Sequence, residues 1–280
     1  MKAEKKYRGT IVPAITPLNE DMTLDTGAVE KLFALFRQHG VMPFILGTTG
    51  EAPSLPASVK QIYIRLAGRL KQPGELLYAG ISGNCLSDSV DWAHRAFDEG
   101  VDVVVATLPS YYALSADQMK RYFEQLAEQV HGPLVIYNIP ATTHQTIPLT
   151  VIDELSHHPN IVGTKDSERD EGRLRNSLEL WAGREDFSHF LGWAAKSGFA
   201  LLNGGDGLIP STANFAPGVY SEMEKAAAAG DEEKVVQLQQ HSDRLGDTYQ
   251  SWRSLGESLA ALKLIMQGEG LCQPYMMPPL

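Results

Sequence analysis

The sequence predicts a closed (β/α)₈ barrel followed by a small helical region at the C-terminus. Short β-branched and apolar runs alternate with longer segments of helical period through the first two thirds of the chain. The runs are almost continuously apolar, which is typical of parallel strands that are covered on both faces. Eight such strand–helix units imply a barrel. A doubly wound open sheet is the alternative fold, but no dinucleotide-binding glycine fingerprint follows the first run.

The first four predicted strands each lead into a segment of helical period. We expect these strands at residues 10–15, 43–46, 76–81 and 102–106, and the helices at 26–38, 56–70, 87–99 and 115–130. In the first helix, Val29, Leu32, Phe33 and Phe36 recur on one face, and Gly40 follows its end. This spacing predicts a helix that packs one apolar stripe against the barrel.

The second half of the barrel is expected to follow the same pattern. The remaining strands are predicted at 134–137, 161–165, 187–191 and 199–203, with helices at 149–157 and 170–182. From about Pro217 three helical segments follow one another without a strand, at 219–229, 231–251 and 255–267. We therefore expect a barrel over residues 1–216 and a helical region over 217–280.

Composition limits the class of protein and its partners. The chain has 280 residues, 43% of them apolar and 21% charged, which is typical of a globular protein and not of a disordered chain or coiled coil. The net charge of −10 argues against nucleic acid and anionic membranes as partners. Cys85 and Cys272 lie far apart and show no metal or redox spacing, and the charged N-terminus lacks an apolar leader, so we expect a cytoplasmic location.

Polar residues follow several predicted strands, at the end of a barrel where active sites lie. These residues are Gly47-Thr48-Thr49-Gly50-Glu51, the pair Tyr111-Tyr112, the segment Tyr137-Asn138-Ile139-Pro140, and Lys165. Taken separately, each has an ordinary interpretation: a turn, an aromatic core or interface pair, a buried aromatic residue and a solvated surface charge. Together they form a chemically coherent set.

Lys165 is the residue on which this set depends. A lysine in an apolar barrel mouth loses hydration, which lowers its pKa and makes the neutral amine available to attack a carbonyl. Tyr137, one strand away, is placed to pass protons to and from the resulting carbinolamine. Thr48 and Thr49 offer hydroxyl and N–H donors for the carboxylate of a 2-keto acid, and Gly47 allows close approach.

Other kinds of site find little support. The eight histidines show no His-Glu-x-x-His or similar pattern, so no metal is expected. The run Asn203-Gly204-Gly205-Asp206-Gly207 lacks the Gly-Lys-Ser/Thr that would make it a phosphate loop, and we interpret it as a flexible turn. A Gly-x-Ser-x-Gly nucleophile motif does not occur.

Three motifs, in this order and spacing, resemble the dihydrodipicolinate synthase/N-acetylneuraminate lyase family of class I aldolases. They are Gly47-Thr48-Thr49-Gly50-Glu51, Tyr137-Asn138-Ile139-Pro140 and Gly163-Thr164-Lys165-Asp166. The similarity runs from about Gly9 to Cys272–Pro274 and so covers nearly the whole chain. It implies a homotetrameric barrel lyase that forms a Schiff base with pyruvate or another 2-keto acid, with no cofactor beyond the covalent imine.

The resemblance also implies a role for each site residue. Lys165 would form the imine, Tyr137 would carry the proton, and Thr48 and Thr49 would bind the carboxylate. Thr49 would also link Tyr137 to a tyrosine from a neighbouring subunit, for which Tyr112 is the closest match and Tyr111 its neighbour. The backbone carbonyl of Ile209 would complete the keto-acid pocket.

Departures from the family pattern concern the second substrate. The synthases carry an arginine, after the Tyr-Asn-x-Pro motif, that grips the carboxylate of aspartate semialdehyde; here Thr142 stands in its place. The sialic acid lyases carry acidic residues after strand seven, where this chain has Trp193 and Ala194. His144 stands where relatives usually have glycine; it would contact a substrate hydroxyl or act as an acid–base group, and the alternative is an ordinary loop residue.

In having a threonine at the arginine position, the chain also resembles the 2-keto-3-deoxy sugar acid aldolases. We therefore expect the activity of such an aldolase. The alternatives are dihydrodipicolinate synthase or a 2-keto acid dehydratase of the same family. Outside enzymology, a catalytically silent 2-keto-acid sensor is the remaining hypothesis. The retention of Lys165, Tyr137 and both threonines favours the enzyme, because a sensor would not need that full set.

Overall fold

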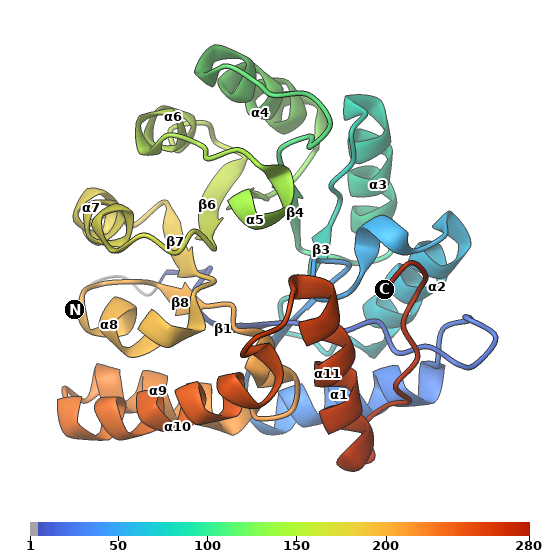
Figure 1. The fold of residues 1–280 in the computed structure, drawn as a ribbon. Coiled ribbons are helices and arrows are strands. Elements are labelled where there is room, and N and C mark those ends of the chain that lie inside the picture. The colour runs from blue at the N-terminus through green and yellow to red at the C-terminus, as the bar shows by residue number, and fades with distance from the viewer. Residues whose placement is uncertain (1–4) are drawn as a thin grey trace.

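Eight parallel strands close into a barrel in the order β1 to β8, which confirms the predicted fold class (Figure 1). The fold is that of a computed structural model, which describes residues 5–280. The strands are β1 Gly9–Pro13, β2 Met42–Ile45, β3 Tyr78–Gly80, β4 Val103–Thr107, β5 Leu134–Asn138, β6 Ile161–Asp166, β7 Ser188–Leu191 and β8 Gly207–Leu208.

Helices surround the barrel and continue into the C-terminal region (Figure 1). The α-helices are α1 Thr26–Gln38, α2 Ala57–Leu70, α3 Leu86–Asp98, α4 Ala116–Gln129, α5 Pro140–Thr143, α6 Leu149–Leu155, α7 Glu171–Trp181, α8 Ser197–Leu202, α9 Pro217–Ala228, α10 Glu232–Gln250 and α11 Leu255–Gly268. Short 3₁₀ helices are η1 Ala52–Ser54, η2 Ala194–Lys196 and η3 Ser211–Asn214. Among the described residues, no helix combines the length and apolar character that crossing a membrane would require.

Local sequence explains where several helices begin. The Asp25 carboxylate accepts a hydrogen bond from Ala28 N at 3.0 Å and so caps α1. Ser115 and Gln118 form a reciprocal capping box at the start of α4, and Ser254 and Glu257 form another at α11. The apolar stripe predicted on α1 is buried.

The predicted strand at 199–203 is wrong, because this segment belongs to helix α8. A short apolar run does not by itself distinguish a strand from a buried helix. Gly198 lies close to α10, where a Cβ at this position would meet Val235 Cγ1 at 2.7 Å. The eighth strand is instead Gly207–Leu208, in and after the run that we interpreted as a turn. Its Gly207 has almost no room for a side chain, since a Cβ would lie 2.2 Å from Gly9 O.

Two apolar layers position the functional end of the barrel. The larger layer lies between strands and helices, and the smaller fills the barrel interior. The interior layer consists of Ile11, Phe44, Tyr78, Val103, Val105, Val135, Tyr137, Ile139, Phe190 and Ile209. Tyr137 therefore points into the barrel, as its proposed chemistry requires.

The C-terminal helices lie against the end of the barrel at which the strands finish. Tyr249 of α10 shares hydrogen bonds with the hydroxyls of Ser211, at 2.7 Å, and Thr212, at 2.9 Å, in the helix that follows β8. After α11 the chain turns back and runs towards the segment before α2 (Figure 1). The loops that follow the strands and the C-terminal tail are therefore neighbours in space.

Candidate active site

Lys165 lies on β6 inside the barrel and is only 3% exposed. It is in register with Tyr137 of β5 and Phe190 of β7. Its Nζ lies 4.0 Å from the centre of the Tyr137 ring and 5.2 Å from that of Phe44. Three strands thus surround the lysine with aromatic side chains, and the interpretation as a surface charge does not apply.

The electrostatic surroundings of Lys165 favour a neutral amine. Burial lowers the pKa of Lys165, and the neighbouring Tyr137 phenol opposes this shift only in part. No carboxylate within residues 5–280 forms an ion pair with Lys165. A buried lysine without a counter-ion is the form of lysine that attacks carbonyl carbon.

The Tyr137 phenol contacts a hydroxyl that the sequence analysis did not single out. Ser167 Oγ lies 3.4 Å from Tyr137 OH. Ser167 follows Lys165 by two residues, and side chains at this spacing share one face of an extended strand, which is the signal that would have identified it. Gly192 makes room for this serine, because a Cβ there would lie 2.0 Å from Ser167 Oγ.

The Thr48-Thr49 loop follows β2 and is held in a strained conformation. Thr49 is buried, and Thr48 is half-buried. Leu46 and Glu51, on either side of the threonines, both have left-handed backbones, with φ of 56° and 57°. Each costs roughly 1–3 kcal/mol for a non-glycine residue, so the surrounding contacts must hold the loop in place. One such contact is the hydrogen bond from Thr16 Oγ1 to Gly50 O, at 2.6 Å.

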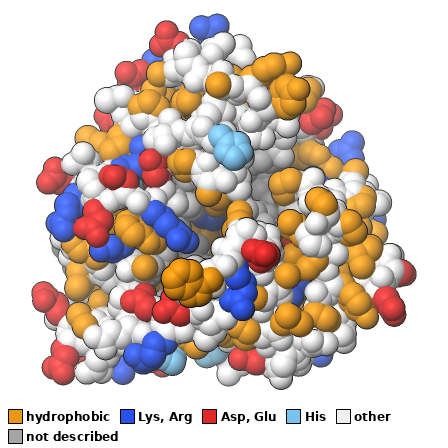
Figure 2. All heavy atoms as spheres, in the orientation of Figure 1, with side chains coloured by type: hydrophobic (Ala, Val, Ile, Leu, Met, Phe, Trp, Pro, Cys, Tyr) orange, Lys and Arg blue, Asp and Glu red, His pale blue; other side chains and the backbone are white. Residues whose placement is uncertain are grey.

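A cavity of about 460 Å³ opens beside these groups. Its wall includes the rings of Phe44 and Tyr137, together with Gly47, Thr48 and Thr142. The corresponding face of the molecule is hollowed near its middle, while charged side chains gather over α7 and α8 (Figure 2). The barrel mouth therefore combines an apolar, aromatic floor with a few hydroxyl groups.

The other predicted site residues differ in how far they are buried in the barrel. Ile209 is buried in the same interior layer as Tyr137, and its N–H donates to Leu191 O at 2.8 Å. His144 is exposed at the end of α5, with φ of 57°, and it is not part of the cavity wall. Tyr111 and Tyr112 are 79% and 74% exposed, and their rings contact each other edge to face at 4.9 Å.

A polar network supports the ends of β5 and β6 from outside the barrel. Asp166 Oδ2 pairs with Arg173 Nε at 2.7 Å, and Asn138 Nδ2 donates to Asp166 Oδ1 at 3.1 Å. Because Asn138 follows Tyr137 and Asp166 follows Lys165, this network fixes the two catalytic candidates relative to each other.

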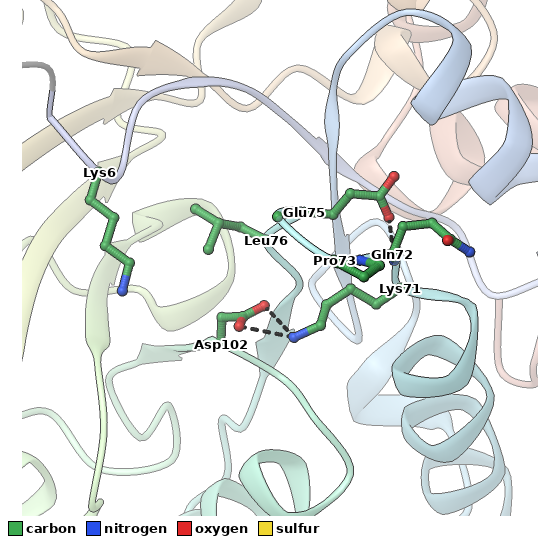
Figure 3. A pocket seen from close by; sticks show the side chains of 8 residues that line it. Lys6, Lys71, Gln72, Pro73, Glu75, Leu76 and Asp102 are labelled. Atoms are coloured by element: carbon green, nitrogen blue, oxygen red, sulfur yellow. Dashed lines mark hydrogen bonds and ion pairs between the residues drawn. The ribbon is translucent and has the colours of Figure 1, made fainter.

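A second hollow, of about 630 Å³, lies at the opposite end of the barrel, where the strands begin (Figure 3). Its side chains mostly satisfy one another: Lys71 Nζ contacts both oxygens of Asp102, at 2.9 and 3.0 Å. No group of three or more potential metal-ligating side chains occurs in the described part of the chain. The catalytic end of the barrel is therefore the candidate site.

Known proteins are similar to this chain in sequence. Residues 6–280 match the dihydrodipicolinate synthetase family. An uncharacterised DapA-like lyase of Thermofilum pendens is 32% identical over 98% of this chain and 92% of its own length. The 4-hydroxy-tetrahydrodipicolinate synthase of Laribacter hongkongensis is 31% identical over 80% of this chain and 76% of its own.

Solved structures give the same result. The dihydrodipicolinate synthase of Bacteroides thetaiotaomicron superposes with a TM-score of 0.92 at 28% identity, over 99% of this chain and 93% of that one. YagE, a prophage protein from Escherichia coli K12 solved in complex with pyruvate, gives 0.92 at 28% identity, over 98% and 93%. This chain therefore belongs to the dihydrodipicolinate synthetase family and is a lyase of the class I aldolase type.

Proposed function

We propose that this lyase forms an imine between Lys165 and pyruvate or a related 2-keto acid, and then makes or breaks a carbon–carbon bond with an aldehyde. The observation that carries the proposal is the buried Lys165 amine, which lies 4.0 Å from the Tyr137 ring centre and has no carboxylate paired with it among residues 5–280. YagE, a family member of the same fold, binds pyruvate.

The steps follow from the groups at the barrel mouth. The neutral Lys165 amine attacks the keto carbon, and the carbinolamine loses water to give the iminium ion. Loss of a proton from the adjacent carbon gives an enamine, which attacks the aldehyde; water then releases the product and restores the amine. Tyr137, backed by the Ser167 hydroxyl, carries protons to and from the carbinolamine oxygen. No cofactor enters this sequence.

The Thr48-Thr49 loop is the proposed carboxylate site. Gly47 and Thr48 line the cavity beside Tyr137, and the neighbouring backbone is held by the hydrogen bond from Thr16 Oγ1 to Gly50 O. Hydroxyl and N–H donors on a rigid loop suit a small anion because little entropy is lost on binding. The Ile209 backbone carbonyl, directly after β8, would complete the pocket.

For the second substrate we propose a neutral, hydroxylated aldehyde, so that the full substrate is a 2-keto-3-deoxy sugar acid. Thr142 and Thr143 line the cavity where a synthase would need a charged partner for aspartate semialdehyde. The missing arginine would cost an acidic aldehyde about 2–5 kcal/mol of binding. Synthase activity is the second candidate, since relatives at 31% identity carry that name.

Borohydride trapping tests the imine. Pyruvate plus borohydride should add one stable adduct per chain, mapped to Lys165, and the Lys165→Met variant should gain none. Lys60→Met is the matched control, because Lys60 also lines the cavity but lies on α2, and it should trap like the wild type. An unmodified wild-type mass would refute the proposal.

A second assay tests the aldehyde. Turnover with glyceraldehyde should exceed turnover with aspartate semialdehyde in the wild type, and Thr142→Arg should shift the preference towards the semialdehyde. A wild type that prefers the semialdehyde would make the synthase the better assignment.

We also propose a homotetramer, in which the exposed pair Tyr111 and Tyr112 lies at a subunit contact and Tyr112 reaches towards the neighbouring site. Their exposure on the single chain supports this. Light scattering on the wild type and on Tyr112→Ala measures the assembly; a wild type that is monomeric at working concentration would refute it.

A further inference from the structure

A buried ion pair joins the Thr48-Thr49 loop to the C-terminal helix. Glu51 Oε1 lies 2.6 Å from Lys263 Nζ, and the two side chains are 0% and 1% exposed. Glu51 follows Thr49 by two residues, whereas Lys263 lies in α11, near the other end of the sequence. The pair thus connects the proposed carboxylate site to the far end of the chain.

Both members of the pair also bind the tail that follows α11. Lys263 Nζ donates to Tyr275 O at 2.6 Å, and Met277 N donates to Glu51 Oε2 at 2.7 Å. Figure 1 shows this tail returning from α11 towards the segment that precedes α2. We call these four groups, namely the Glu51 carboxylate, the Lys263 ammonium, Tyr275 O and Met277 N, the clasp.

Stability alone does not account for the clasp. Removing two charges from water is costly, and an apolar pair of similar size often stabilises a fold as well as a buried ion pair or better. In some proteins a buried charged or polar group instead fixes one conformation. Here Glu51 has a left-handed backbone, with φ of 57°, at the end of the strained loop. The clasp therefore holds the Glu51 carboxylate through both of its oxygens, next to a backbone position that other contacts must stabilise.

The Lys263 ammonium depends on the same two partners, the Glu51 carboxylate and Tyr275 O. Burial lowers the pKa of Lys263, while the charge and hydrogen bond of Glu51 oppose that shift. Without Glu51, the ammonium would be left buried with one carbonyl partner, and without the tail it would lose that carbonyl. Loop, helix and tail thus depend on one another through one ion pair and its two hydrogen bonds to the backbone of the tail.

We propose that the clasp positions Thr48 and Thr49 for the carboxylate of the keto acid, so that the C-terminal tail is part of the support of the binding site. Glu51 and Lys263 are positioning residues: they act through the loop and do not touch the substrate. The inference rests on the proposed function, in which this loop binds the carboxylate.

Two variants test the clasp. Glu51→Gln/Lys263→Met removes both charges at similar volume, and a chain that ends at Pro274 removes the tail bonds while keeping the ion pair. Carboxylate binding contributes to ground and transition states alike, so both variants should raise the pyruvate KM by about tenfold and leave kcat within about twofold. If the first variant does not fold, the truncated chain gives the answer.

The matched control is Glu224→Gln. This carboxylate is also largely buried and accepts a hydrogen bond from Thr10 Oγ1 at 2.6 Å, but it lies at the opposite end of the barrel, where β1 begins. The Glu224→Gln substitution should reduce thermal stability without changing the pyruvate KM. Folded clasp variants with a wild-type KM would overturn the proposal, as would a KM increase of the same size in the control.

Hydrogen exchange separates this inference from the proposed function. If wild-type protein fails the borohydride trap, the function is wrong, and the clasp is then judged by amide exchange at residues 47–51. Faster exchange there in the truncated chain would support the clasp, and unchanged exchange would overturn it.

Discussion

Replacing His189 by methionine should make the protein more resistant to acid. His189 lies on β7 and is 1% exposed, and neither ring nitrogen has a hydrogen-bond partner among residues 5–280. Its ring lies against Trp181 of α7, with 5.6 Å between ring centres. Burial lowers the pKa of His189 from 6.5 to about 4; nearby Asp166 opposes the shift, and Arg173 and Lys5 add to it.

Proton linkage gives the sign and size of the effect of His189 on the free energy of unfolding. Between pH 6.5 and 4 the unfolded chain protonates this histidine while the folded protein does not, so stability falls as the pH is lowered. One pKa unit corresponds to about 1.4 kcal/mol, so His189 should cost the wild type about 3 kcal/mol over this interval. About 2 kcal/mol of that should be lost by pH 5, before most carboxylates titrate.

Urea unfolding of wild type and His189→Met at pH 7, 6 and 5 measures the difference. The variant should lose about 2 kcal/mol less than the wild type between pH 7 and pH 5. His241→Met, at an exposed position on α10, is the control and should follow the wild type. Parallel pH profiles for wild type and His189→Met would show that His189 is not held neutral by burial, and would refute the reasoning.

Three further predictions concern the site and its support. Tyr137→Phe should lower kcat by about 10²–10⁴-fold, because the proton carrier is lost, yet still trap pyruvate on Lys165; an unchanged kcat would exclude the proton role. The rate of pyruvate trapping by wild type should rise with pH and level off below pH 10.5, because burial lowers the pKa of Lys165; levelling at or above 10.5 would contradict a lowered pKa. Arg173→Met should lower the free energy of unfolding by about 3–5 kcal/mol, because it leaves buried Asp166 without its cation. Arg65→Met, which removes one partner of an exposed ion pair with Glu99, is the control and should lower it by less than about 1 kcal/mol. Equal effects of the two substitutions in urea titrations would refute this.

Sequence patterns located most of the fold because most elements have a strong local signal. Helix α1 begins and ends where its apolar spacing and the glycine that follows it predict, at Thr26 and Gln38. The pattern failed at α8 and β8. There the run Phe199–Leu202 is apolar enough for either element, and the true strand begins with a glycine, which reads as a turn.

Some residues of the candidate site could be predicted from the sequence, and others could not. The two residues that we propose perform the chemistry, Lys165 and Tyr137, stand at strand ends, and this alone predicts that they meet at one end of a barrel. Ser167 and Phe44 were not predicted, because their role depends on which side chains the closed barrel brings against Tyr137 and Lys165.

The sequence by itself determined the barrel, the position of the lysine that we propose forms the imine, and the presence of a threonine where the resemblance to the synthases would place an arginine. Each of these depends on local periodicity or on residue identity at a strand end. Only the tertiary structure decided that Lys165 is buried among aromatic rings, and that Glu51 meets Lys263 and the C-terminal tail. Burial and long-range pairing arise when the chain closes on itself, and no local pattern encodes the distance between residues 51 and 263.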